Sequence, residues 1–241
     1  MGEGYSLYAM GDDEALMKTI HLANIACGFH ASDFMIMNKT VLLAKENNIL
    51  IGAHPSLPDL QGFGRREMAI EPDELASCFI YQVGALSGFL HVHGLEMNHL
   101  KPHGAVYGQT ARSVELARSV VGVAKQFNVS FMGLAGTAHQ VAAQELGVKF
   151  IAEWFADLDY SPEGKLLITK KHDPLSLEEV ESRVKRMLSD GLITTKNGTM
   201  PIAEGIQEIS ICVHSDTPGA LEIAKLVKRL VDSSNTKYGF I

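Results

Sequence analysis

The chain has 241 residues, 46% of them hydrophobic and 20% charged, which is typical of a globular protein with a sizeable core. Its 21 basic and 28 acidic residues give a formal net charge of −7, and Lys and Arg form no dense cluster, which argues against nucleic acid as a partner. We predict no secretory signal and no membrane span. The three cysteines, Cys27, Cys78 and Cys212, are far apart and unpatterned, which favours the cytoplasm over a disulfide framework or zinc knuckle.

Short apolar runs alternate with longer segments of helical period along the whole chain. In chain order, the predicted strands and helices are strand 23–29, helix 33–48, strand 49–54, helix 71–94, strand 98–104, helix 112–128, strand 129–136, helix 137–146, strand 148–155, helix 176–191, strand 208–214 and helix 217–233. Ser176 and Glu179 form a capping box, and Pro218 suits a first helical turn. Continuous apolar strands that alternate with helices predict one α/β domain over residues 1–241, with a parallel sheet covered by helices.

Ionisable residues follow five of the six predicted strands at the point where each strand ends. In α/β barrels the chemistry collects at the carboxyl ends of the strands, so we expect these side chains to meet at one catalytic or metal-binding mouth. They are His30 and Asp33, His54, Lys101 and His103, Glu153 and Asp157, and His214 and Asp216.

Each of these residues also has a structural role open to it. Asp33 could cap the helix that follows it. Any one histidine could be a hydrogen-bonded core residue, but four at equivalent positions favour function. Lys101 adjoins a buried strand, where lysine is costly unless paired. Asp216 is a less natural cap than Thr217, which precedes Pro218, so we favour a functional role for Asp216.

A glycine-rich loop, GFGRR, offers two arginines beside the second strand. Arg65 and Arg66 could clamp a carboxylate in bidentate fashion, or one could only brace the loop. The loop is not a phosphate loop, because no Gly-Lys-Ser/Thr follows it. His91, His93 and His99 have a spacing that does not suit a helical metal pair, and we predict them to lie on the surface.

Six longer motifs stand out in the chain: ANIACGFHASD, IGAHPSLPDLQGFGRR, YQVGAL, KPHGAVY, EWFADLDYSPEGKL and CVHSDTPGA. They extend over nearly the whole chain and resemble the LamB/YcsF family, which is named for lactam utilisation. The characterised role of that family is the A subunit of the bacterial ATP-dependent 5-oxoprolinase. The resemblance implies an irregular seven-stranded β/α barrel, similar to the glycoside hydrolase and deacetylase barrels.

The N-terminus matches the family only in part. The first strand of the family ends in an Asn-x-Asp-x-Gly-Glu pattern, and Gly2 and Glu3 match its last two positions. The asparagine and aspartate would precede Met1, so the resemblance implies a barrel that lacks its first strand in this chain. If the barrel closes between the first and last strands, the unpaired edges belong to the strands that lead to His30 and His214.

The resemblance implies ring opening of the lactam 5-oxoproline to L-glutamate, coupled to ATP and carried out with B- and C-type subunits. We find no Walker A sequence, so we expect ATP to be shared with or bound by those partners. A homo-oligomer is compatible with this arrangement. Three residues depart from the family pattern: Ser32 and Ser215 replace a usual glycine, and Leu158 replaces a frequent arginine.

The predicted site combines acid–base groups with substrate-binding groups. Its catalytic residues are Glu3, His30, Asp33, His54, Lys101, His103, Glu153, Asp157, His214 and Asp216. Its substrate-binding residues are Asn24, Arg65 and Lys101. The candidates for a divalent metal are His30, Asp33, His54, His103 and His214, and the residues do not decide between metal and pure acid–base chemistry. Two alternatives stay open: a metal-dependent deacetylase or amidohydrolase acting on another small amide, and a truncated non-catalytic subunit.

Overall fold

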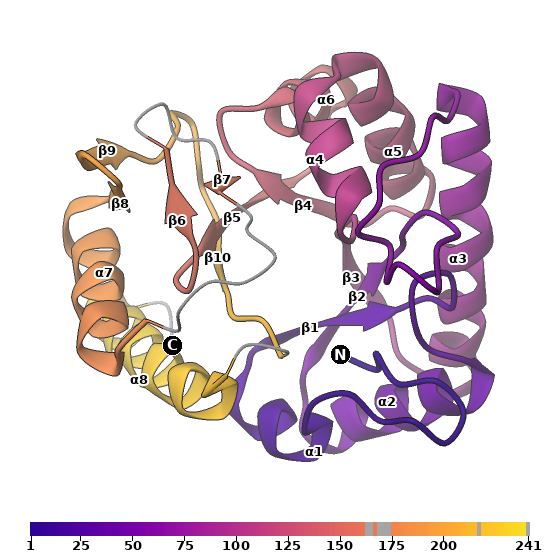
Figure 1. Ribbon diagram of the computed structural model, residues 1–241, viewed down its shortest axis with the longest axis horizontal. Helices are drawn as coiled ribbons and strands as arrows, with labels where there is room; N and C mark the ends of the chain where they lie inside the picture. The colour runs from indigo at the N-terminus through magenta and orange to yellow at the C-terminus, as the bar shows by residue number, and fades with distance from the viewer. Residues whose placement is uncertain (162–165, 168–174, 216–217, 240–241) are drawn as a thin grey trace.

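All six predicted strands form one parallel sheet in the computed structural model, which describes residues 1–161, 166–167, 175–215 and 218–239. The sheet order is β1-β2-β3-β4-β5-β10, and Figure 1 shows it curled into a half-barrel. The strands are β1 (Leu22–Ala26), β2 (Leu50–His54), β3 (Met97–Leu100), β4 (Ser130–Leu134), β5 (Phe150–Phe155) and β10 (Ile209–Cys212).

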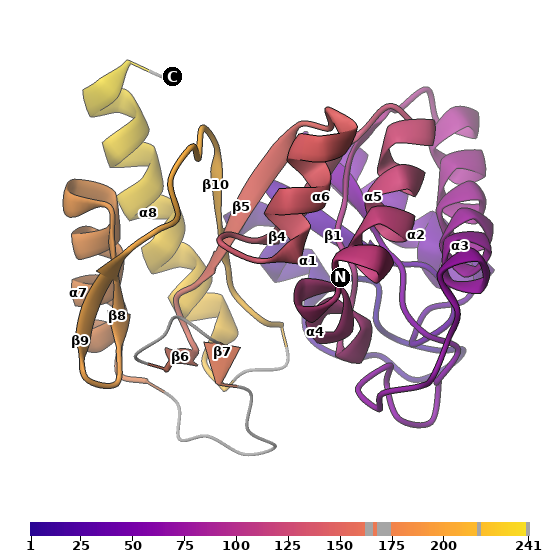
Figure 2. The ribbon, with the colours of Figure 1, turned by 90° about the horizontal axis from the view of Figure 1, so that it is seen from above.

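The helices lie on the outer side of this curled sheet (Figures 1 and 2). They are α1 (Asp13–Leu16), η1 (Met17–Thr19), α2 (Phe34–Glu46), α3 (Pro72–Val92), α4 (Ala105–Arg112), α5 (Val114–Gln126), α6 (Ala138–Leu146), α7 (Leu177–Asp190) and α8 (Ala220–Tyr238). One apolar core joins β1–β4 to α2, α3, α5 and α6, and a second joins β5 to α7 and α8.

The register of the sheet brings the carboxyl ends of the strands to one edge. Ala26 of β1 pairs with His54 of β2, and the amide of Lys101, just after β3, donates to the carbonyl of Ala53. On the other side, Cys212 of β10 pairs with Phe155 of β5. The residues that follow these strands therefore share one end of the half-barrel, which we call the mouth.

β1 and β10 form the two edges of the sheet, as predicted for the strands that lead to His30 and His214. Met1 lies along β1, because its carbonyl accepts from the amide of Ala26 at 3.1 Å. Outside the sheet, Leu16 of α1 packs against Ala220 and Ala224 of α8. A seventh strand is not tested by this arrangement and stays a prediction.

Helix α3 is the element that bears on the prediction that no segment spans a membrane. It is the one helix among the described residues that is long and apolar enough, by length and composition alone, to cross a membrane. Its residues Leu75, Phe79, Val83, Leu86 and Leu90 are buried in the larger apolar core. The helix therefore has the packing of a core helix in a globular domain.

Several boundaries differ from the predictions. Helix α4 was not predicted, and neither were two small antiparallel pairs, β6 (Asp159–Tyr160) with β7 (Leu166–Leu167) and β8 (Leu192–Thr195) with β9 (Gly198–Pro201). Asn197-Gly198 is the kind of sequence that favours a hairpin turn and could have predicted the second pair.

The last helix was predicted to begin at residue 217 and end at 233, and both bounds are wrong. Helix α8 begins at Ala220, because Gly219 in a left-handed conformation forms its N-cap. It continues to Tyr238. In α7 the hydroxyl of Ser176 caps the helix as predicted, while the carboxylate of Glu179 accepts a hydrogen bond from Arg183.

Candidate functional site

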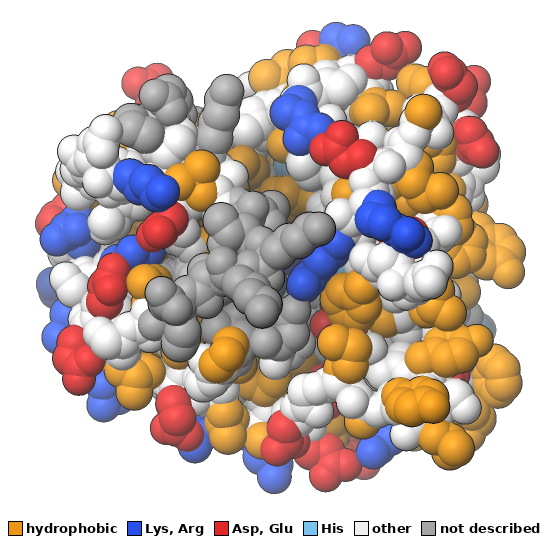
Figure 3. Space-filling view, in the orientation of Figure 1, with side chains coloured by type: hydrophobic (Ala, Val, Ile, Leu, Met, Phe, Trp, Pro, Cys, Tyr) orange, Lys and Arg blue, Asp and Glu red, His pale blue; other side chains and the backbone are white. Residues whose placement is uncertain are grey.

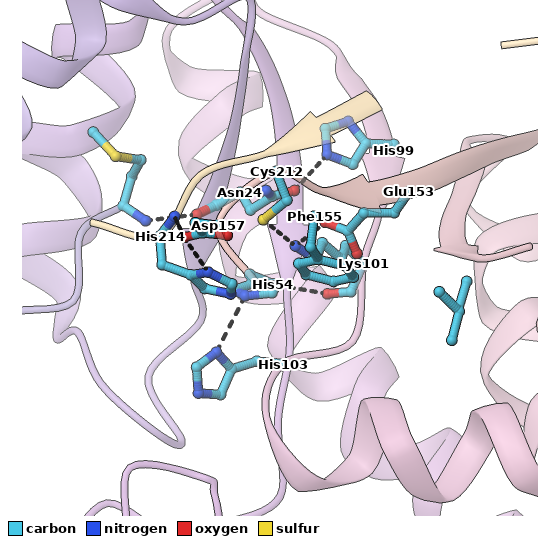
Figure 4. Close-up of polar contacts among 12 residues, drawn as sticks. Asn24, His54, His99, Lys101, His103, Glu153, Phe155, Asp157, Cys212 and His214 are labelled. Carbon is cyan, nitrogen blue, oxygen red and sulfur yellow. Dashed lines mark hydrogen bonds and ion pairs between the residues drawn. The ribbon is translucent and has the colours of Figure 1, made fainter. Parts of the chain in front are cut away.

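Two groups of ionisable side chains, most of them buried, meet at the mouth, and Figure 4 labels members of both, among them His54, His103 and Lys101. The first, which we call the histidine cluster, consists of Glu3, His30, His54 and His103. The second, the lysine cluster, consists of Lys101, Glu153 and Cys212, with the pair of Asp157 and His214 beside it.

The loop after β2 is held close to the end of β3, and this fixes the histidine cluster. Gly104 follows His103 with φ of 63°, and a Cβ there would collide with the carbonyl oxygen of Gly64. The amide of Ala105 donates to that same carbonyl at 2.8 Å. The missing side chain at Gly104 lets the two backbones touch, so the loop carbonyl of Phe63 reaches His103.

Backbone carbonyls set the tautomers of His54 and His103. Nδ1 of His54 lies 2.8 Å from the carbonyl oxygen of Lys101, and Nε2 of His103 lies 2.9 Å from that of Phe63. A carbonyl oxygen only accepts, so each of these nitrogens carries the hydrogen. In the neutral rings, Nε2 of His54 and Nδ1 of His103 therefore carry lone pairs, and these two atoms are 3.1 Å apart.

Burial keeps both rings in the neutral form. It lowers the pKa of His54 well below its usual value, and the positive charges of His103 and Lys101 would lower it further. Burial and the neighbouring His30 lower the pKa of His103 to about 3. The two lone pairs are therefore available at neutral pH.

Glu3 joins three parts of the mouth through its carboxylate. Oε1 lies 3.3 Å from Nε2 of His30 and 3.7 Å from Nδ1 of His103, while Oε2 accepts from the hydroxyl of Ser215 at 3.3 Å. Burial would raise the pKa of Glu3, but the amine of Met1 and the adjacent histidines hold it well below its usual value. Glu3 is therefore a carboxylate anion. The ring of His30 stacks on that of His103 with centroids 3.6 Å apart.

The lysine cluster has a buried ion pair at its centre. The ammonium of Lys101 pairs with the carboxylate of Glu153, and both residues are at most 5% exposed. Lys101 also donates to the sulfur of Cys212 at 3.5 Å, which makes this cysteine part of a polar contact. Burial would lower the pKa of Lys101, but its anionic neighbour raises it, and the charged form is retained.

A partly buried His214 and a buried Asp157 form the second pair. Nδ1 of His214 lies 3.0 Å from Oδ2 of Asp157, and the imidazole stacks on the ring of Phe155. Burial lowers the pKa of His214, but the hydrogen bond and the charge of Asp157 raise it above its usual value. His214 thus differs from the histidine cluster, because its pKa is raised rather than lowered.

Comparison with known proteins gives the family of the chain. The family model for LamB/YcsF matches residues 1–239. The chain belongs to the LamB/YcsF family. It is 48% identical to the lactam utilization protein lamB of Emericella nidulans over 242 residues, covering 100% of this chain and 95% of that protein.

Two further relatives extend the comparison. The 5-oxoprolinase A subunit of Pyrococcus abyssi is 40% identical over 241 residues, covering 98% of this chain and 93% of that protein. The crystal structure of a lactam utilization protein from Thermus thermophilus matches with a TM-score of 0.89 at 34% identity, covering 98% of this chain and 94% of that one. The half-barrel is therefore a fold that this LamB/YcsF chain shares with a solved structure.

Some predicted site residues lie apart from the two clusters. Asp33 caps α2: its carboxylate accepts from the amides of Met35 and Ile36 at 2.8 and 3.0 Å, and also from that of Ser6 at 2.7 Å. Asn24 accepts a hydrogen bond from Nε2 of His99 at 2.8 Å.

The remaining two predicted residues are Arg65 and Asp216. Arg65 is exposed, and its guanidinium lies 5.0 Å from the centre of the Phe63 ring, next to the histidine cluster. Asp216 lies outside the described residues.

Sequence reasoning missed two features of the mouth. His99, predicted to lie on the surface, is fully buried because it sits within β3 rather than in a connection. Tyr107 of α4 is buried beside Glu153; burial and that carboxylate raise its pKa well above its usual value. The alternation within strand 98–104 was the signal that could have placed His99 inside.

Ser215, which stands where the LamB/YcsF family usually has glycine, is part of the site. Its hydroxyl supplies the hydrogen bond to Glu3 described above. A glycine at this position would leave that oxygen of Glu3 without this donor. The departure from the family pattern therefore adds a contact to the histidine cluster.

Proposed function

We propose that this chain is the A subunit of an ATP-dependent 5-oxoprolinase, which opens the lactam ring of 5-oxoproline to give L-glutamate together with B- and C-type subunits. The observation that carries the proposal is the meeting at the mouth of histidines whose pKa is lowered with one whose pKa is raised, in a chain 40% identical to a protein named as the A subunit of 5-oxoprolinase. Its relative lamB, named for lactam utilization, supports the same substrate class.

The two kinds of histidine suit the two proton transfers of amide hydrolysis. Water must lose a proton as its oxygen bonds to the carbonyl carbon, and the ring nitrogen must gain one as the C–N bond breaks. We place the attacking water at the histidine cluster, beside the lone pairs of His54 and His103, and assign the uptake of its proton to that cluster. His214, whose pKa Asp157 raises, can donate the second proton to the leaving nitrogen.

We assign the carboxylate of 5-oxoproline to Arg65 rather than to Lys101. The charge of Lys101 is already neutralised by Glu153, and the residue is only 5% exposed. Its role in this scheme is to hold the end of β3 against β5 at the mouth. Arg65 presents an exposed guanidinium beside the histidine cluster, which suits bidentate binding of a carboxylate. Asn24, bonded to His99, acts in this scheme as a positioning residue.

ATP and the partner subunits complete the proposed reaction. Because the chain contains no Walker A sequence, we assign ATP binding to the partners or to an interface shared with them. Exposed apolar side chains, among them Leu7, Tyr8, Phe34 and Met35, support association with other subunits. The three free cysteines suit a reducing compartment, and we place the reaction in the cytoplasm.

The test measures glutamate formed from 5-oxoproline by this chain alone, by the B- and C-type subunits alone, and by all of them together, with and without ATP. We expect glutamate only from the full mixture with ATP. Release of an amide product by this chain alone, without ATP, would instead support a metal-dependent amidohydrolase. If the B- and C-type subunits alone form glutamate as fast as the full mixture does, the non-catalytic alternative is correct.

A further inference from the structure

The two lone pairs of the histidine cluster point to a bound cation. Nε2 of His54 and Nδ1 of His103 are 3.1 Å apart, and neither carries a hydrogen in the neutral rings. Two lone pairs at this separation repel unless a proton or a metal ion lies between them. The carboxylate of Glu3 is close to the same point, since its Oε1 lies 3.7 Å from Nδ1 of His103.

We propose that Nε2 of His54, Nδ1 of His103 and the carboxylate of Glu3 bind one divalent transition-metal ion of the Zn²⁺ class. The ligand atoms of these three residues all lie within 4.8 Å of one another. Zinc–nitrogen bonds are about 2.0–2.1 Å long, so two nitrogens on one tetrahedral ion stand roughly 3.3 Å apart. The histidine pair is already near that separation.

The surroundings of the three ligands have the features of a metal site. Each histidine ligand donates its other ring N–H to a backbone carbonyl, which fixes the tautomer and orients the free lone pair. The hydroxyl of Ser215 orients the far oxygen of Glu3. Three protein ligands leave a fourth position for water, as in catalytic zinc sites. Two imidazoles favour zinc, cobalt or iron over magnesium or calcium.

The geometry also separates ligands from the other metal candidates. Nε2 of His30 faces the carboxylate of Glu3 at 3.3 Å, so His30 is a positioning residue that orients this ligand. Asp33 is occupied by three backbone amides, and the ring nitrogens of His214 do not converge with the ligand atoms of Glu3, His54 and His103. Of the five predicted metal candidates, two remain, and Glu3 joins them.

This proposal does not depend on the identity of the substrate, so it is tested by metal binding alone. The untagged chain is freed of metal with a chelator and titrated with Zn²⁺ by calorimetry, and with Co²⁺ by visible absorption. We expect one tight site per chain and a Co²⁺ spectrum typical of four-coordinate nitrogen and oxygen ligands. Absence of a stoichiometric site would overturn the proposal, and the histidine pair would then share a proton.

Variants locate the site. Changing only the hydrogen-bonding partner of a ligand typically weakens metal binding by about 10–100-fold. H103Q and E3Q change the ligands themselves, so we expect each to weaken Zn²⁺ binding by more than that. The matched control is H21Q, because His21 forms a surface pair with Asp232 at 2.7 Å and is a plausible place for adventitious zinc. Loss of binding in H21Q, or equal binding in E3Q and the wild type, would place the ion elsewhere. Since E3Q lies outside the sheet, its result stands even if H103Q does not fold.

Discussion

Burial decides the charge of individual histidines in this chain. The pKa is lowered by burial for His30, His54, His99, His103 and His139, and for the last three it falls to about 3. In the unfolded chain the same residues have the usual pKa of 6.5. As the pH falls below about 6.5, the unfolded state takes up protons that the folded state does not bind.

We therefore expect the free energy of unfolding to decrease as the pH falls from about 6.5 toward 4. Each histidine that stays neutral in the folded state contributes a slope of about 1.4 kcal/mol per pH unit. Urea denaturation of the chelator-treated chain at pH 7 and pH 5 measures this effect. His214 acts in the opposite sense, because its raised pKa stabilises the protonated folded state. A pH-independent stability in this range would show that the other histidines are not held neutral.

The pair of Lys101 and Glu153 gives a second prediction for single residues. K101A leaves a buried carboxylate without its cation, so we expect destabilisation by about 3–5 kcal/mol. The double variant K101M/E153L replaces both charges by apolar groups, and we expect it to regain most of that stability while remaining inactive. Thermal melts and the glutamate assay of the assembled enzyme measure the two properties. A stable, inactive K101A would show that Lys101 acts on the substrate directly.

Helix α2 provides a prediction at the scale of secondary structure elements, because Asp33 caps it and was also a predicted catalytic residue. Asparagine caps helices about as well as aspartate, whereas alanine does not. We expect D33N to keep both stability and activity, and D33A to lose about 1 kcal/mol of stability. Melting curves and the glutamate assay compare the two variants. Inactivity of a stably folded D33N would establish a chemical role for the carboxylate.

On the scale of the whole molecule, the surface charge and the exposed apolar side chains indicate which kinds of partner the chain can bind. On the face drawn in Figure 3, basic and acidic side chains are interspersed with apolar ones and form no broad basic patch. Leu7, Tyr8, Phe34 and Met35 are between 65% and 95% exposed, and they lie on the N-terminal segment and the first turn of α2. Exposed apolar groups of this kind mark contact surfaces for other proteins.

We expect L7S and F34S together to weaken assembly with the B- and C-type subunits without lowering the melting temperature of the isolated chain. Both side chains are largely exposed, so their loss removes little core packing. Co-purification of the assembled enzyme measures the effect, and V92S is the matched control, because Val92 is 76% exposed at the far end of α3. Normal assembly of the L7S/F34S variant would assign the partner contact to another surface.

The six strands of the sheet could be predicted from the sequence because buried parallel strands are continuous apolar runs bounded by polar residues. The meeting of their carboxyl ends on one side followed from the same pattern, and so did the placing of His54, His103 and Lys101 at one mouth. The hairpin of β8 and β9 was missed because its apolar runs are short and half exposed. His99 was misplaced although it fell within the predicted strand 98–104, because it was judged together with His91 and His93 by its spacing and not by the alternation of the strand.

The sequence by itself determined the family, the α/β class and the chemical types of residue at the mouth. Only the tertiary structure decided which of those residues touch. Asp33 and His30 lie three positions apart, yet one caps a helix and the other faces Glu3, because the chain turns between them. The tautomers of His54 and His103 depend on carbonyls of Lys101 and Phe63, which reach them through the close approach of Gly64 and Gly104. Such contacts join residues about 40 or more positions apart in the chain, where residue spacing along the sequence carries no information about distance.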